Sequence, residues 1–348
     1  MRLHGINEGG WLGPQGWFGA VYSSDAARAN DVFHSVDQRF TPAQAETLKT
    51  TWKDHWLTEV DFDMIKSYQF NMIRVFFSYE AFQNEDGSWK LDAQGNIDFT
   101  RMDWLVREAG ARGLYVVPTL AGWRTQREDY GLISWYGADA DKARADAADL
   151  WREVARHYKD NSIMAGFDVL NEPTGSPGNM PHNVLYEAIR AIDPNRMIIM
   201  ESTGIDSRWS NVMYSIHDYN MMGSLANNQA SLAQNLTQYH AFLDNNVPVY
   251  IGEFMTGSDF LPQLLKQYND LGIHWSPFEY KAVDMGGWAV VDLFRAPCEV
   301  NIDTDSYEHI LLQWSNLATT TSNNYKQNVY IQAYQAANAD AEAAASAP

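Results

Sequence analysis

Cysteine is almost absent from this chain of 348 residues, in which Cys298 is the single example. One cysteine excludes an intramolecular disulfide and a cysteine-based zinc site, so the hydrophobic core alone must hold the fold together. Long apolar runs are absent as well, since no stretch approaches the roughly 20 residues that a membrane-spanning helix needs. The first residues contain no apolar signal segment either.

Basic residues are few, with 25 Lys and Arg against 44 Asp and Glu, which gives a net charge of −19. No run of Lys or Arg is present, and an acidic chain without a basic patch repels phosphate. Nucleic acid and membranes are therefore excluded as partners, and a neutral or cationic ligand is expected. The hydrophobic share of 45% is enough for a sizeable core and excludes intrinsic disorder.

Several motifs that identify other enzyme classes are missing. The nine histidines are scattered without an H-x-x-x-H pair, and there is no carboxylate loop of the calcium-binding type. No G-x-S-x-G segment presents a serine nucleophile, and no G-x-G-x-x-G loop follows the first apolar run. We therefore expect neither a metal nor a cofactor.

Short apolar runs alternate with helical periodicity along nearly the whole chain, which is typical of β-α units. Apolar residues recur every three to four positions over residues 147–158, 185–192, 260–271 and 310–317. The expected strands are Leu3–Asn7, Met72–Phe76, Tyr115–Thr119, Ala165–Asn171, Met197–Glu201, Met213–His217, Val249–Glu253 and Ile273–Phe278. We predict an α/β fold: a single-domain (β/α)8 TIM barrel over residues 1–338, followed by an alanine-rich tail over 339–348. A doubly wound open sheet is the competing architecture.

Two glutamates close strands of this predicted barrel. The fourth strand ends at Asn171-Glu172-Pro173 and the seventh at Gly252-Glu253, and barrel strands deliver their ends to one common mouth. A pair of carboxylates across a cleft is what glycosidic cleavage needs, because one protonates the departing oxygen while the other attacks the anomeric carbon. The pair therefore predicts a glycosidase.

Charged and polar neighbours predict different roles for the two glutamates. Arg74 lies on the second strand, and His217 and Tyr219 follow the sixth. We expect Arg74 and Tyr219 to keep Glu253 ionised as the nucleophile. His217 is expected nearer Glu172, which is less well paired and would hold its proton as the acid.

Further side chains are candidates for sugar contacts. Tryptophans are usually buried, but those beside glycine or polar residues would suit the flat faces of sugars. The candidates of this kind are Trp11, Trp123 and Trp288. Two more carboxylates that close strands, Glu201 and Glu279, are expected to pack or to line the rim.

Together these residues resemble glycoside hydrolase family 5, a group of retaining, cellulase-type (β/α)8 enzymes, with the exo-β-glucanase branch nearest. The marks are Arg74, Asn171-Glu172-Pro173, His217-Asp218-Tyr219, Gly252-Glu253, the opening Gly5-Ile6-Asn7-Glu8-Gly9-Gly10-Trp11-Leu12 and Trp56-Leu57-Thr58-Glu59-Val60-Asp61-Phe62. The resemblance implies that Glu172 is the general acid/base, that Glu253 is the nucleophile and that Asn171 binds the sugar 2-hydroxyl. Two positions depart from the family: no histidine closes the third strand, and Phe278 stands where a tryptophan platform is usual.

The expected function is that of a retaining glycoside hydrolase, which cleaves β-glucosidic bonds in β-glucans or in cello- and laminari-oligosaccharides by double displacement. Mannan or xylan cleavage is the alternative within the family, and a non-catalytic carbohydrate-binding barrel is the alternative outside enzymes. The insertion over residues 17–56 is expected to wall the cleft. We expect a monomer that is secreted, because polymeric substrates do not enter cells.

Overall fold

The computed structural model describes residues 2–25, 28–29, 31–84, 86–122, 140–173, 181–202, 204–286, 289–320, 324–326 and 328–346. Two of the aromatic candidates for sugar contacts, Trp123 and Trp288, lie outside these residues.

Eight parallel strands form one sheet in which each strand pairs with the next along the chain. They are β1 (Gly5–Leu12), β3 (Met72–Ser78), β4 (Tyr115–Gly122), β5 (Gly166–Asp168), β6 (Met197–Glu201), β7 (Val212–Asp218), β8 (Val249–Phe254) and β9 (His274–Trp275). The last strand returns to the first, since the Trp275 N–H donates to the Leu3 carbonyl at 3.1 Å. The predicted barrel is confirmed, and each expected strand has its counterpart.

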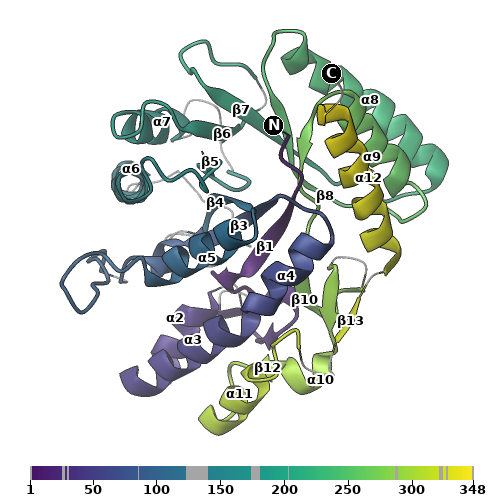
Figure 1. Cartoon of the computed structure of the whole chain (residues 1–348). Coiled ribbons are helices and arrows are strands. Elements are labelled where there is room, and N and C mark those ends of the chain that lie inside the picture. The colour runs from purple at the N-terminus through teal and green to yellow at the C-terminus, as the bar shows by residue number, and fades with distance from the viewer. Residues whose placement is uncertain are drawn as a thin grey trace.

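Helices lie outside the strands, as Figure 1 shows. They are α2 (Val32–Arg39), α3 (Pro42–Trp56), α4 (Glu59–Ser67), α5 (Thr100–Ala111), α6 (Ala140–His157), α7 (His182–Arg190), α8 (Leu225–Leu243), α9 (Leu261–Asp270), α10 (Arg295–Cys298), α11 (Tyr307–Trp314) and α12 (Asn328–Ser346), with short 3-10 turns η1 (Gly16–Phe18) and η2 (Tyr79–Ala81). Helix α6 illustrates the packing: Leu150, Trp151 and Val154 share its inner face and are fully or almost fully buried. Such a stripe orients a helix against the sheet.

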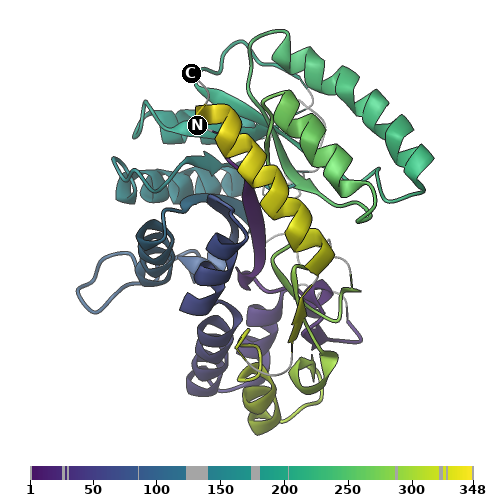
Figure 2. The same ribbon diagram turned by 45° about the vertical axis from the view of Figure 1, so that its right-hand side comes forward.

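Short strands complete the fold outside the barrel. They are β2 (Val21–Tyr22), β10 (Lys281–Val283), β11 (Val291–Leu293), β12 (Val300–Asn301) and β13 (Asn324–Lys326). Strand β2 pairs with β12, and α3 packs against both α2 and α11. The insertion after β1 and the segment after β9 therefore form one layer, seen at the bottom of Figures 1 and 2.

The alanine-rich C-terminal segment is helical where it was expected to be a tail. Helix α12 continues through Ser346, and Ala341 is buried. The helix runs beside α9, as Figure 2 shows, and the Asn269 amide donates to the Ala337 carbonyl at 2.8 Å. Alanine has the highest helix propensity, and the contact with α9 adds tertiary support.

An apolar layer fills one end of the barrel and sets the direction of the polar residues above it. Its buried members are Leu3, Met72, Val117, Ile199, Met213 and Tyr250. Alternate strand residues face the same side, so Arg74 follows Met72 inward, Thr119 follows Val117 and Glu201 follows Ile199. The polar site thus rests on an apolar floor.

Strand β8 departs from this alternation by one residue. The register pairs Ile216 with Ile251 but His217 with Glu253, so Gly252 is an extra residue in β8. A bulge of this kind re-aims the side chain that follows it. Glu253 therefore faces the interior beside His217, which strict alternation from Tyr250 would forbid.

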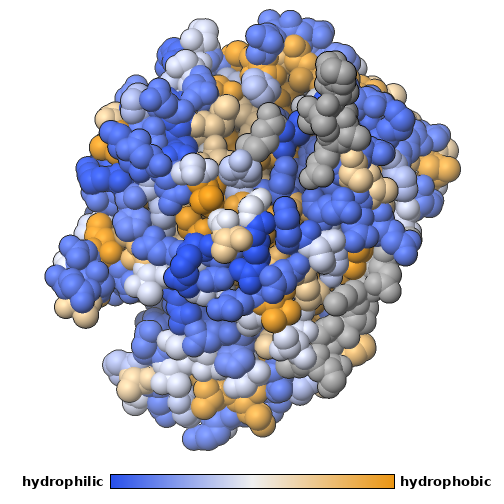
Figure 3. Space-filling model, viewed as in Figure 1, coloured by the Kyte–Doolittle hydropathy of each residue, from blue (hydrophilic) through white to orange (hydrophobic). Residues whose placement is uncertain are grey.

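The surface is largely polar on the face that Figure 3 shows, and apolar residues are scattered over it. Within the described part of the chain, no helix combines the length and the hydropathy needed to cross a membrane.

We expect replacement of the bulge glycine, Gly252→Ala, to destabilise the barrel by about 1–3 kcal/mol, the usual cost of overpacking. A methyl group there would lie 2.4 Å from Ser215 Oγ and 3.1 Å from His217 Nε2. Urea unfolding of the two proteins measures the difference. The matched control is Gly204→Ala, whose methyl group would meet nothing within 4 Å.

Addition of Ser215→Ala to the Gly252→Ala variant should restore part of the lost stability, because it removes the nearest atom. A Gly252→Ala protein as stable as the wild type would contradict the close packing of the bulge.

Candidate active site

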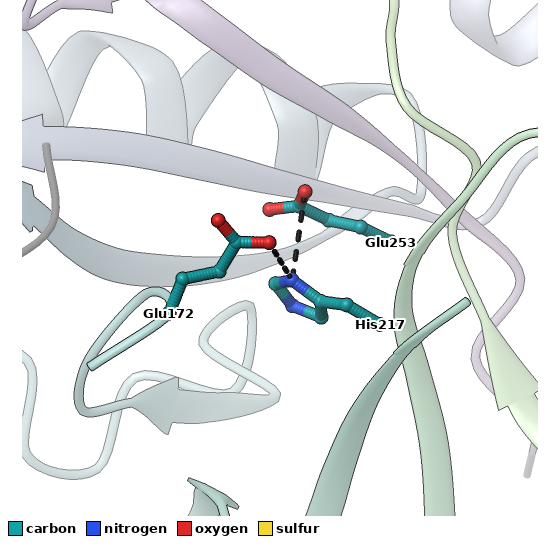
Figure 4. A group of neighbouring side chains, drawn as sticks. All are labelled: Glu172, His217 and Glu253. Atoms are coloured by element: carbon teal, nitrogen blue, oxygen red, sulfur yellow. Dashed lines mark hydrogen bonds and ion pairs between the residues drawn. The ribbon is translucent and has the colours of Figure 1, made fainter. Parts of the chain in front are cut away.

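The two predicted catalytic glutamates lie at one end of the barrel and point toward each other. Glu172 follows β5 and Glu253 lies in β8, and His217 of β7 stands beside both carboxylates (Figure 4). One ligand-type atom of each of these three side chains lies within 4.8 Å of the others. An oxygen of Glu172 and an oxygen of Glu253 thus lie within 4.8 Å of each other, which favours the separation of about 5 Å between the carboxyl groups of retaining glycosidases over the 6.5–9.5 Å of inverting ones.

Glu253 is buried and held at both oxygens. Arg74 Nη1 donates to Oε1 at 2.8 Å, and the Tyr219 hydroxyl donates to Oε2 at 2.6 Å. The predicted pairing of Arg74 and Tyr219 with Glu253 is confirmed. Burial raises the pKa of Tyr219 far above its ordinary value, and the Glu253 charge raises it further, so this hydroxyl keeps its proton.

Arg74 itself is fully buried, and each nitrogen of its guanidinium donates a hydrogen bond. Its Nε donates to Asp168 at 2.8 Å, and its Nη atoms donate to Asn7 at 2.9 Å and to Asn171 at 2.8 Å. Burial alone would lower the pKa of Arg74, but the charges of Asp168 and Glu253 raise it above its ordinary value. The guanidinium is therefore a permanent cation at the centre of the site.

His217 couples to the other glutamate, as predicted. Its Nδ1 lies 2.8 Å from Glu172 Oε1 and 3.6 Å from Glu253 Oε2. Burial lowers the pKa of His217, but Glu201, Glu253 and the hydrogen bond to Glu172 together raise it to about 9. The ring is thus an imidazolium at neutral pH.

Glu172 is the less well paired glutamate, as expected, since its carboxylate contacts His217 alone among the described side chains while that of Glu253 accepts from Arg74 and Tyr219. The expectation that it therefore keeps its proton is wrong. The hydrogen bond from His217 lowers the pKa of Glu172 and outweighs the opposing effect of burial. The physical reason is the cationic ring beside it, since an ionised partner favours the carboxylate. Glu172 is also the more accessible acid, with 38% of its side chain exposed against 5% for Glu253.

Sequence reasoning missed two residues of the site. Asn7 accepts from Arg74 and donates from its amide to the Gly252 carbonyl at 2.9 Å, which ties β1 to the bulge. Asp168 supplies the second carboxylate to Arg74. Both lie on predicted strands, Asn7 inside the quoted opening motif and Asp168 shortly before Asn171, so the inward alternation of those strands was the signal that could have found them.

Glu201, expected at the rim or in packing, contacts Glu172 directly. Its Oε2 accepts the Glu172 N–H at 2.7 Å and lies 3.6 Å from His217 Nε2. Glu279 is buried away from these contacts and accepts the N–H groups of Gly9 and Lys281.

Trp11 does not serve as a sugar platform. Its ring is fully buried in the core, and its Nε1 donates to the Lys53 carbonyl at 2.9 Å, so no face of the ring is open to a ligand. Phe278 is 4% exposed, and its ring stacks on that of Trp17 with 5.2 Å between the ring centroids. Trp17 belongs to the insertion after β1, so this insertion does reach the end of the last barrel strand.

Glu172, His217 and Glu253 are close enough to suit a cation as well. However, each Glu253 oxygen already accepts a strong hydrogen bond, and Arg74 supplies the positive charge that a metal would bring. The donor set therefore favours catalysis by paired carboxylates.

Comparison with known proteins gives this arrangement its family. The model of Cellulase (glycosyl hydrolase family 5) matches residues 36–282. The chain belongs to glycosyl hydrolase family 5. The predicted family is thereby confirmed.

Curated relatives carry several names. A "Beta-xylosidase" of Phanerodontia chrysosporium is 26% identical over 246 residues, which are 64% of this chain and 49% of that protein. An "Endoglucanase" of Paenibacillus polymyxa is 24% identical over 225 residues, 55% of each chain. The chain thus spans about half the length of these relatives.

Solved structures support the fold. Endoglucanase Cel5A of Thermotoga maritima, in complex with cellobiose, is 18% identical to this chain with a TM-score of 0.57. The match covers 90% of this chain and 97% of the Cel5A chain. The cellulose synthase subunit Z of Clostridioides difficile is 17% identical with a TM-score of 0.58, over 90% and 99% of the two chains.

We expect the stability that His217 contributes to depend on pH. Folding raises its pKa from 6.5 to about 9, so the contribution is complete below about pH 6.5 and is lost as pH rises through about 9. The pKa shift corresponds to a contribution of about 3 kcal/mol to the free energy of unfolding. The difference in unfolding free energy between the wild type and His217→Asn should therefore shrink between pH 6 and pH 10 in urea titrations. A difference that stays constant would refute the charged state of the ring.

Proposed function

We propose that this protein is a retaining β-glycosidase, with Glu253 as nucleophile and Glu172 as general acid/base. The observation that carries the proposal is the pair of carboxylates within 4.8 Å, one bound by a permanent cation and the other by a titratable one. Arg74 gives Glu253 a fixed positive partner, and His217 can exchange a proton with Glu172.

The proposed reaction runs in two displacements. Glu253 attacks the anomeric carbon while Glu172 protonates the leaving oxygen, so the glycosidic bond breaks as an ester to Glu253 forms. Glu172, now a carboxylate, takes a proton from water, and the oxygen of that water displaces Glu253. The anomeric configuration is retained overall.

Asn171 would bind the 2-hydroxyl of the sugar in the reacting subsite. Its Oδ1 accepts from Arg74 at 2.8 Å, which fixes the orientation of the amide and leaves its Nδ2 group as the donor. A hydrogen bond to this hydroxyl strengthens in the transition state of glycosidases.

β-Glucan is the substrate class we favour, cleaved as polymer or as cello- or laminari-oligosaccharide. Relatives named "Endoglucanase" and "Glucan 1,3-beta-glucosidase" support it. Xylan is the second candidate, because a "Beta-xylosidase" also matches; mannan is a further alternative. Action on polymers would place the enzyme outside the cell, and we infer a secreted monomer.

Replacement of the nucleophile, Glu253→Gln, should abolish hydrolysis of an aryl β-glucoside while sugar binding by calorimetry persists. The amide keeps the size of the side chain but cannot form the ester. Proton NMR of the first wild-type product should show the β-anomer. A first product of inverted configuration would refute the nucleophile, and a wild type that binds sugar without hydrolysis would favour the binding-only alternative.

Replacement of the acid/base, Glu172→Ala, should slow hydrolysis of glucosides with poor leaving groups by about 10²–10⁴-fold, the usual contribution of general acid catalysis. A dinitrophenyl glucoside needs no protonation, so its first displacement should survive, and azide should restore turnover by replacing water. No rescue by azide would contradict the role of Glu172. Parallel assays on β-1,4-glucan, β-1,3-glucan, xylan and mannan then assign the substrate.

A further inference from the structure

Glu201 contacts both parts of the acid/base arrangement with one carboxylate. It closes β6, and its Oε2 accepts the Glu172 N–H at 2.7 Å. The same oxygen lies 3.6 Å from His217 Nε2. The proposed catalytic roles do not use this third acid.

The main chain at Glu172 needs such a partner. Its φ of 42° lies in the left-handed region, which a residue with a side chain enters only where the surroundings hold it. Strand β5 has already ended at Asp168, and the Asn171 N–H still donates to the Leu120 carbonyl of β4 at 2.9 Å. At Glu172 itself the N–H donates to the Glu201 side chain and not to a neighbouring strand. The bond to Glu201 therefore supports the conformation that aims Glu172 into the site.

The imidazole ring of His217 has two different sides. Nδ1 faces Glu172, whereas Nε2 is buried and has no hydrogen-bond partner among the described residues. The carboxylate within ion-pair distance of Nε2 is Glu201. A negative charge on this side keeps the Nε2 proton in place, in the way that a buried carboxylate orients a catalytic histidine.

We propose that Glu201 is a positioning residue for the general acid/base: it holds the main chain of Glu172 and keeps the Nε2 proton on His217, so that the Nδ1 proton is the one exchanged with Glu172. The proposal rests on the proposed glycosidase function. In the first displacement the Nδ1–H bond breaks as an O–H bond forms on Glu172, and this proton then passes to the leaving oxygen. In the second, Glu172 takes a proton from water and returns it to Nδ1, so no proton is gained or lost.

The charged groups around the His217 ring define the pH range in which Glu201 can play this role. Besides Glu201, the ring faces Glu172, Glu253, Asp168 and the cation Arg74. Burial raises the pKa of Glu201 to about 7, and the pKa of His217 is about 9. An ionised Glu201 therefore faces a protonated His217 between about pH 7 and pH 9.

The test is Glu201→Gln, which keeps an oxygen for the Glu172 N–H and removes the charge. NMR titration should give His217 a pKa lower by about one unit or more, since a neighbouring charge shifts a pKa by one to three units. The alkaline limb of the pH profile of kcat/KM should move to lower pH by the same amount. The rate for a poor leaving group should fall at least about tenfold more than the rate for the dinitrophenyl glucoside.

Two further variants complete the test. Glu201→Asp keeps the charge, so its alkaline limb should stay near that of the wild type even if the shorter side chain lowers the rate. Asp206→Asn is the matched control on the loop after β6, where Asp206 pairs with the exposed Arg208, and it should change neither limb nor rate.

An unchanged pKa of His217 in a folded Glu201→Gln protein would overturn the proposal. An equal loss of rate for substrates with poor and with good leaving groups would overturn it as well. The NMR titration needs no activity, so it separates this failure from a failure of the glycosidase function itself. If Glu201→Gln does not fold, Glu201→Asp is the deciding variant. A shift of the alkaline limb of its kcat/KM profile would then overturn the proposal.

Discussion

The buried guanidinium of Arg74 is the interaction on which the rest of the site depends. It joins β1, β3, β5 and β8 through Asn7, Asp168, Asn171 and Glu253 at hydrogen-bond distances of 2.8–2.9 Å. An unpaired charge at this depth would be prohibitively costly, and a buried pair is tolerated only with good geometry and satisfied hydrogen bonds. The two carboxylates and two amides meet this condition, and they thereby fix Glu253 relative to Asn171.

Backbone features make this arrangement possible. The apolar layer at the other end of the barrel sets which strand residues face inward, and the bulge at Gly252 corrects β8 so that Glu253 joins them. A bulge costs ladder hydrogen bonds, but the Asn7 amide donates to the Gly252 carbonyl at 2.9 Å and compensates part of that cost. Asn7 therefore contributes to the site through both Arg74 and the bulge.

Sequence patterns predicted the barrel and much of the site because strand order alone brings strand ends to one mouth. Arg74, His217 and Tyr219 were paired with the correct glutamates on that basis. The same reasoning failed where the answer depends on packing or on local charge. Trp11 is adjacent to glycine in the sequence, yet its ring is in the core, and neither the bulge in β8 nor the contact from Glu201 to the Glu172 N–H has a pattern of its own.

The chemical difference between two cations explains why two similar carboxylates would take different roles. An arginine cannot release its proton near neutral pH, so Arg74 gives Glu253 a fixed positive charge and no proton, which suits a nucleophile. A histidine can release its proton, and His217 holds one within 2.8 Å of Glu172. The lowered pKa of Glu172 is then compatible with an acid role, because the proton is stored on the adjacent ring and a bound sugar that displaces water favours the neutral carboxyl.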